Sequence, residues 1–122
     1  PAADSALAAL LTDLSERGML EETIVAWVGE FGRAPKISAN AGREHYPRCY
    51  SGVLAGGGIR GGQVYGASDA TGSAPIAGAA SPHEFTATLM HALGIAPEAT
   101  LPDRSGRPHR LHGGRPIMEL FA

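Results

Sequence analysis

Two apolar runs place the strongest constraint on how this chain folds. Residues 23–29, TIVAWVG, and residues 50–58, YSGVLAGGG, carry no charged side chain. Alternate side chains of a strand point to opposite faces, so both faces of each run are apolar or small. Such strands are covered on both sides, as in a parallel sheet flanked by helices. The runs therefore predict neighbouring strands at residues 23–29 and 50–55, and the connection of about twenty residues favours parallel pairing over a hairpin.

Helical patterns lie on either side of these two runs. Leucines recur at helical spacing within residues 7–14, and Gly18 supplies the left-handed residue that commonly ends a helix. Residues 81–84, SPHE, match a capping box with proline at the first helical position, and Gly94 ends the helix that follows. Residues 66–80 are rich in Gly, Ala, Ser and Pro, which predicts a loop. This order of elements predicts the α/β class.

Length and charge set the limits on domain number and partners. The chain has 122 residues, which is enough for one small domain, and its charged content of 18% is that of a globular protein. Because it begins with Pro1 and enters a helical pattern at once, we interpret residues 1–122 as a single domain or as a fragment of a larger one. A net charge of -2 with dispersed basic residues argues against nucleic-acid binding, and no apolar stretch is long enough to span a membrane.

Potential metal ligands follow the first apolar run. Glu30 comes directly after it, and ligands of open parallel sheets bind beyond the carboxyl ends of the strands. Glu44 and His45 add a carboxylate and an imidazole, which suit divalent metals such as Zn or Mn. The alternatives are a surface ion pair between Glu30 and Arg33, and a Glu-His dipeptide that occurs by chance.

Basic side chains lie close to these candidate ligands in the sequence. Arg33, Lys36 and Arg43 are the candidates for holding an oxyanion such as phosphate or sulfate, since the guanidinium fork of arginine matches such groups. The alternative is a solvated basic loop. Gly56, Gly58 and Gly61 satisfy the G-x-G-x-x-G pattern, but the following residues do not read as a helix, so a dinucleotide site is not expected.

Three longer segments carry a family resemblance. Residues 23–37, TIVAWVGEFGRAPKI, residues 42–69, GREHYPRCYSGVLAGGGIRGGQVYGASD, and residues 86–95, TATLMHALGI, are similar to the C-terminal part of the domain of unknown function 1501 family. That bacterial family is grouped with the alkaline phosphatase/sulfatase superfamily. The resemblance extends over residues 7–121. It implies the C-terminal part of an alkaline phosphatase/sulfatase-like fold and a periplasmic or other extracytoplasmic location.

The resemblance also implies a function and a set of ligands. It implies a metal-dependent hydrolase acting on an anionic phosphate or sulfate ester, with Zn, Mn, Mg or Ca as the divalent metal. Glu30 occupies the place of a metal-binding aspartate, His45 that of a later loop ligand, and Glu44-His45 that of the usual Asp-His pair. Phe31 stands where the superfamily has a metal-binding histidine.

The nucleophile and the first metal carboxylates of the superfamily lie on early strands that these residues do not contain. The resemblance therefore implies that the upstream part of the same protein supplies them, and it leaves the catalytic residues unassigned. The alternative is a superfamily relative that has lost catalysis and acts as a binding or structural module.

Overall fold

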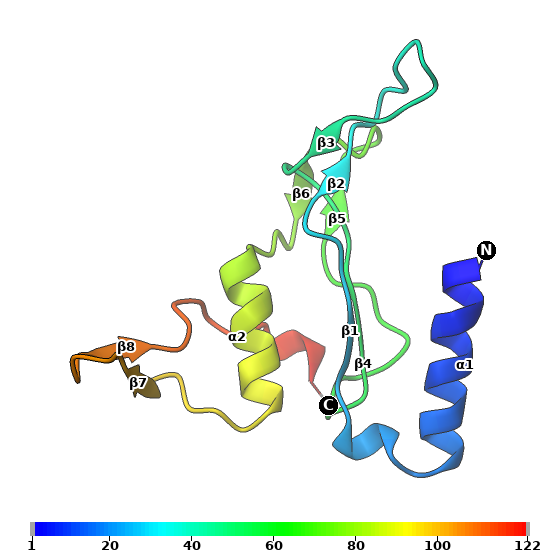
Figure 1. Cartoon of the computed structure of the whole chain (residues 1–122). Coiled ribbons are helices and arrows are strands. Elements are labelled where there is room, and N and C mark those ends of the chain that lie inside the picture. The colour runs from blue at the N-terminus through cyan, green and yellow to red at the C-terminus, as the bar shows by residue number, and fades with distance from the viewer. Residues whose placement is uncertain (1, 122) are drawn as a thin grey trace.

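A computed structural model describes residues 2–121. Its two α-helices are joined to eight short strands and two short 3-10 segments, and the strands form four separate antiparallel pairs (Figure 1). In chain order these elements are α1 (Ala2–Glu16), η1 (Leu20–Glu22), β1 (Val25–Trp27), β2 (Gly32–Arg33), β3 (His45–Tyr46), β4 (Val53–Ala55), β5 (Ala67–Ser68), β6 (Pro75–Ala77), α2 (Pro82–Ala92), β7 (Thr100–Pro102), β8 (Pro108–Arg110) and η2 (Met118–Leu120).

Both helices form where the sequence predicts them. Helix α1 ends before Gly18, which adopts a φ of 67° that favours glycine. Helix α2 begins with the predicted capping box. The Glu84 amide donates to Ser81 Oγ at 3.2 Å, and the Ser81 amide donates to Glu84 Oε2 at 2.8 Å. These bonds satisfy amide groups at the helix start that have no partner within the helix.

The two apolar runs form neighbouring strands, but the prediction of a parallel sheet flanked by helices is wrong. Strand β1 pairs with β4 in the antiparallel direction, with Val25 opposite Ala55 and Trp27 opposite Val53. We call this pair the central ribbon. A parallel pair needs a crossover connection, usually a helix. The connection here contains no helix and doubles back on itself as the β2–β3 pair, so the chain returns antiparallel.

The Gly-rich segment and the C-terminal region also form hairpins, which corrects the predicted loop at residues 66–80. Strands β5 and β6 enclose the turn DATGS, and β7 and β8 enclose the turn DRSGR. Each turn begins with an Asp whose carboxylate accepts hydrogen bonds from the turn. Asp69 Oδ1 accepts from the amides of Thr71 at 3.0 Å and Ser73 at 2.8 Å. Asp103 Oδ1 accepts from two amides at the equivalent positions. The shared D-x-[ST]-G pattern is the signal that predicts both turns.

Acid is expected to loosen the β7–β8 hairpin. The Ser105 hydroxyl, then His109 and the Arg107 amide, lower the pKa of Asp103 from 3.8 to about 2. Because its pKa is lowered in the folded hairpin, the Asp103 carboxylate stabilises the hairpin at pH values above the ordinary pKa of 3.8. This contribution is lost as the pH falls through about 2. The amide proton resonances of Ser105 and Arg107 should therefore shift in an NMR titration over that range. In Asp103→Asn this titration should disappear, and its persistence would contradict the assignment.

Few side chains are buried within the described residues. The buried apolar set is Leu14, Ala87 and Ile117, joined by the polar Thr88. Thr88 connects two segments, because the Ile117 amide donates to its Oγ1 at 3.0 Å. The C-terminal segment that contains Ile117 is thus attached to α2 by one buried hydrogen bond. None of the helices in residues 2–121 has the length and apolarity needed to cross a bilayer, as predicted.

Candidate functional site

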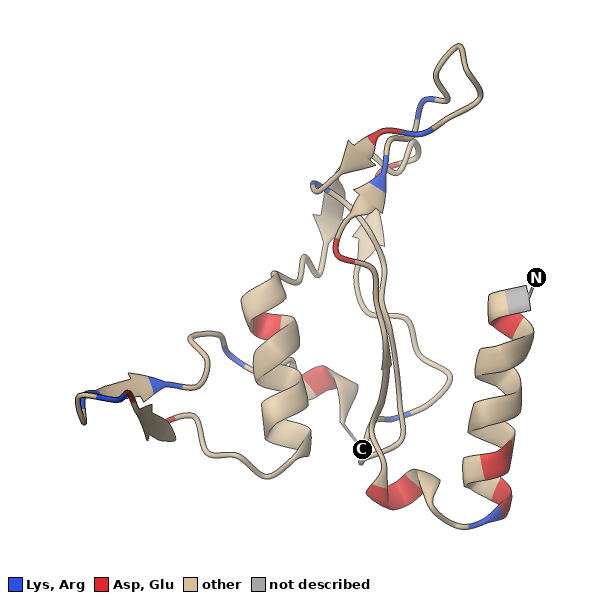
Figure 2. Cartoon of the chain, in the orientation of Figure 1, with Lys and Arg blue, Asp and Glu red and all other residues tan. Residues whose placement is uncertain are grey.

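The candidate site lies on a projecting arm formed by residues 30–48, which we call the β2–β3 arm. Figure 2 marks basic residues in blue and acidic residues in red along this part of the chain. The arm carries four basic and two acidic residues, a formal charge of +2, whereas the whole chain carries -2. The remainder of the chain therefore carries a formal charge of -4. The positive charge is concentrated where the sequence predicts an anion site.

Three side chains of the arm form a stack. The ring centroids of Phe31 and His45 lie 4.1 Å apart, and Arg33 Cζ lies 5.5 Å from the centroid of Phe31. The backbone explains this arrangement, because Arg33 is directly opposite His45 in the β2–β3 pair. Residues two apart on a strand share a face, which brings Phe31 to the same side as Arg33. The guanidinium is within the distance at which a cation is attracted to an aromatic face.

Close backbone packing holds the base of the arm. A Cβ atom at Gly32 would collide with the carbonyl oxygen of Cys49 and would lie 2.9 Å from the carbonyl oxygen of Tyr46. Glycine at position 32 thus allows the two strands to meet. The Tyr46 hydroxyl donates to the carbonyl oxygen of Ser73 at 2.8 Å, which ties β3 to the Asp69 turn. The β5–β6 hairpin therefore braces the arm.

The predicted metal ligands do not form a complete centre within the described residues. Glu30, Glu44 and His45 are all exposed, and no ion pair or side-chain hydrogen bond joins them. Residues 2–121 contain no group of three or more His, Cys, Asp or Glu side chains arranged to hold a metal. A metal centre usually has three or four protein ligands. Among the described residues these donors do not complete a metal centre, and joint ligation by Glu30 and His45 stays a prediction.

The basic residues of the arm are available for an external anion. Arg33, Lys36 and Arg43 are exposed and form no ion pair with any residue in 2–121, so the alternative pairing of Arg33 with Glu30 is not formed there. Arg48, which the sequence interpretation missed, is likewise exposed and unpaired within that range. The signal for it is the basic composition, which continues past His45 to the end of the arm.

A second glycine-rich segment, residues 59–66, lines a different part of the molecule. Residues 59–66 contain a turn at Gly61 and Gly62, and no helix begins there. With β4, the β5–β6 hairpin and Phe85 of α2, this segment borders an open hollow of about 860 Å³. The lining is mainly apolar, and Arg60 beside it donates to the carbonyl oxygen of Glu119 at 2.9 Å. That arginine fastens the glycine-rich segment to η2.

Comparison with known families assigns the chain to a family. Its sequence matches the family described as "Protein of unknown function (DUF1501)" over residues 1–121. The chain belongs to this family. Neither the curated proteins nor the solved structures contain a significant match. The DUF1501 match covers the β2–β3 arm, both helices and residues 59–66.

Proposed function

We propose that this DUF1501 chain is the C-terminal portion of a metal-dependent hydrolase of phosphate or sulfate esters. The longer polypeptide, which we call the parent, would contain the nucleophile in its upstream part. In this proposal the β2–β3 arm binds the anionic group of the substrate. The relationship to the alkaline phosphatase/sulfatase superfamily is part of the proposal and rests on the sequence resemblance.

The observation that carries the proposal is the set of unpaired basic side chains on the arm. Arg33 is oriented by its stack on Phe31, with its Cζ atom 5.5 Å from the ring centroid. An oriented guanidinium loses less conformational freedom when it binds an oxyanion, and its fork accommodates two oxygen atoms. Lys36 and Arg43 add positive charge on the same arm. An anionic ester is therefore the ligand class that fits this surface.

The proposed metal centre is shared between the arm and the upstream part. Glu30, Glu44 and His45 would contribute some of the donors, and upstream carboxylates would contribute the others, because the arm alone is incomplete. A divalent metal bound there would polarise the ester and stabilise the charge that develops on the leaving oxygen. The residues of this chain would hold and orient the anion.

One observation favours a second candidate function, which is anion binding without catalysis. Phe31 stands at a position where the superfamily has a metal-binding histidine, and its ring packs against His45 at 4.1 Å between centroids. A phenyl ring cannot ligate a metal. A non-catalytic relative would keep the basic arm and use it to recognise a phosphorylated or sulfated ligand.

Replacing Arg33 with alanine is expected to weaken recognition of the anionic group. Loss of a charge-assisted contact costs about 1.5 to 3 kcal/mol, which raises KM by about tenfold or more. The measurement is hydrolysis of p-nitrophenyl phosphate and p-nitrophenyl sulfate by the parent, with and without a chelator. Turnover should require the metal.

Arg104→Ala is the matched control, because Arg104 is also exposed and unpaired among the described residues but lies in the β7–β8 turn. Equal effects of the two substitutions would contradict an anion site on the arm. Activity that is indifferent to chelators would remove the metal. If no ester is hydrolysed but calorimetry detects phosphate or sulfate binding that Arg33→Ala weakens, the second candidate function replaces the first.

A further inference from the structure

The described chain exposes more surface than a compact protein of its size. Its accessible surface is 8857 Å². A compact monomer of this mass exposes about 6,200 Å², so the excess is about 2,700 Å². A standard interface buries about 800 Å² on each partner, and only obligate interfaces approach the excess seen here. The chain therefore exposes enough surface for a further component to cover.

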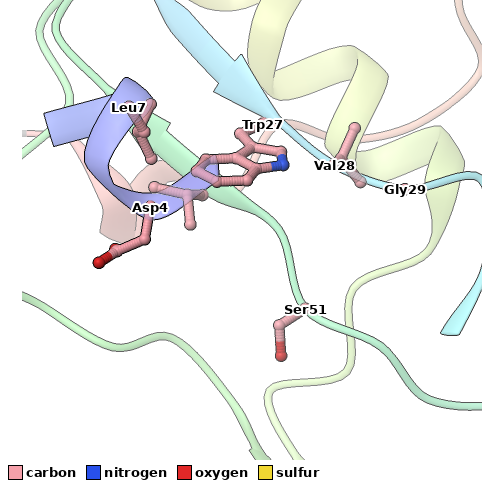
Figure 3. Close-up of a pocket in the computed structure, with 7 residues that line it drawn as sticks. Asp4, Leu7, Trp27, Val28, Gly29 and Ser51 are labelled. Atoms are coloured by element: carbon pink, nitrogen blue, oxygen red, sulfur yellow. The ribbon is translucent and has the colours of Figure 1, made fainter. Parts of the chain in front are cut away.

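The central ribbon and α1 enclose one apolar part of this surface. An open hollow of about 270 Å³ lies between them, and Figure 3 shows Leu7 and Trp27 among the side chains that line it. Trp27 is 39% exposed, and Val53, which also lines the hollow, is 47% exposed. Each ribbon strand has one hydrogen-bonded neighbour strand in residues 2–121, and a two-stranded ribbon is marginally stable in water.

Charge indicates what kind of surface covers the hollow. Residues 2–22, which form α1 and η1, carry five acidic side chains and one basic side chain, a formal charge of -4. Asp4 lies directly on the hollow. A second copy of the chain would bring two such acidic segments together across a symmetric interface, where like charges repel. A complementary partner is apolar at its centre and basic at its rim.

We propose that the upstream part of the same polypeptide fills the hollow between α1 and the central ribbon with an apolar segment bordered by basic side chains. This inference rests on the proposed function, which supplies the upstream part. The ribbon is then an internal element of the assembled protein, and Trp27 is its anchor in the interface. Trp27 and Val53 are directly opposite each other in the ribbon, so covering them buries the ribbon face that borders the hollow.

The test places a fluorine label in the intact parent. One sample carries 5-fluorotryptophan at position 27, and a second carries Leu101→5-fluorotryptophan in the β7–β8 hairpin as an exposed reference. Leu101 is 62% exposed and lies outside the hollow. A soluble paramagnetic chelate should broaden the fluorine resonance at position 101 several-fold more than the resonance at position 27. Equal broadening at the two positions would overturn the proposal.

Two further measurements separate the other outcomes. Dilution of the parent, followed by light scattering, tests for a second copy; protection of Trp27 that disappears as an oligomer dissociates would overturn the proposal. Val53→Asp should lower the thermal unfolding temperature of the parent more than Leu101→Asp, and the reverse order would count against it. None of these readouts needs turnover. An inactive parent with a protected Trp27 would refute the hydrolase and leave this interface standing.

Discussion

Replacing His45 with alanine is expected to lower kcat/KM of the parent by at least ~100-fold. Loss of an outer residue that merely hydrogen-bonds to a metal ligand already costs ~10–100-fold in metal affinity or activity, and loss of a ligand itself should cost more. His45 is exposed on β3, so removal of its ring should affect the fold little. Its ring packs on Phe31 and lies opposite Arg33, where it would face both metal and anion. Steady-state kinetics and the metal content of the purified protein measure the effect.

His109→Ala is the control for this substitution. His109 is an exposed strand histidine like His45, but its ring contacts Asp103 at 3.0 Å in the β7–β8 hairpin. Its loss should leave kcat/KM unchanged. The 122-residue chain alone should show no turnover, because the nucleophile of the proposed hydrolase lies upstream. Turnover by that chain, or full activity of the His45 variant, would refute the shared centre.

Gly56→Ala is expected to destabilise the parent by about 3 kcal/mol or more, by combining left-handed backbone strain with overpacking. Gly56 has a φ of 72°, and a Cβ there would collide with the carbonyl oxygens of Thr23 and Leu20. Those atoms are backbone, so they cannot move aside as a flexible side chain would. Urea unfolding of the parent measures the change in the free energy of unfolding.

Two other glycines separate the two causes of this destabilisation. Gly18 has a φ of 67° with nothing within 4 Å of an added Cβ, so Gly18→Ala should lose only about 1 kcal/mol to backbone strain. Gly61 has an ordinary backbone conformation and equally open space, so Gly61→Ala should be close to neutral. Similar losses at positions 56 and 18 would show that the packing against Thr23 and Leu20 is unimportant.

The candidate site was only partly predictable. The sequence places Arg33, Lys36 and Arg43 on one segment, and this concentration of charge needs no knowledge of the fold. The stack of Phe31 on His45 could not be predicted, because it depends on the β2–β3 register across an eleven-residue connection. Because of the same register, the ring in contact with His45 is that of Phe31, which cannot bind a metal.

The sequence by itself determined the local elements of this protein. The capping box at Ser81 and the left-handed ends at Gly18 and Gly94 depend on hydrogen bonds and dihedral angles within a few residues. Only the tertiary structure decided the direction of the two apolar strands. Their two-sided apolarity is identical in parallel and antiparallel ribbons, so it predicts burial and not orientation. Orientation followed from the connecting segment, which lacks a crossover helix and folds back through its own β2–β3 backbone hydrogen bonds.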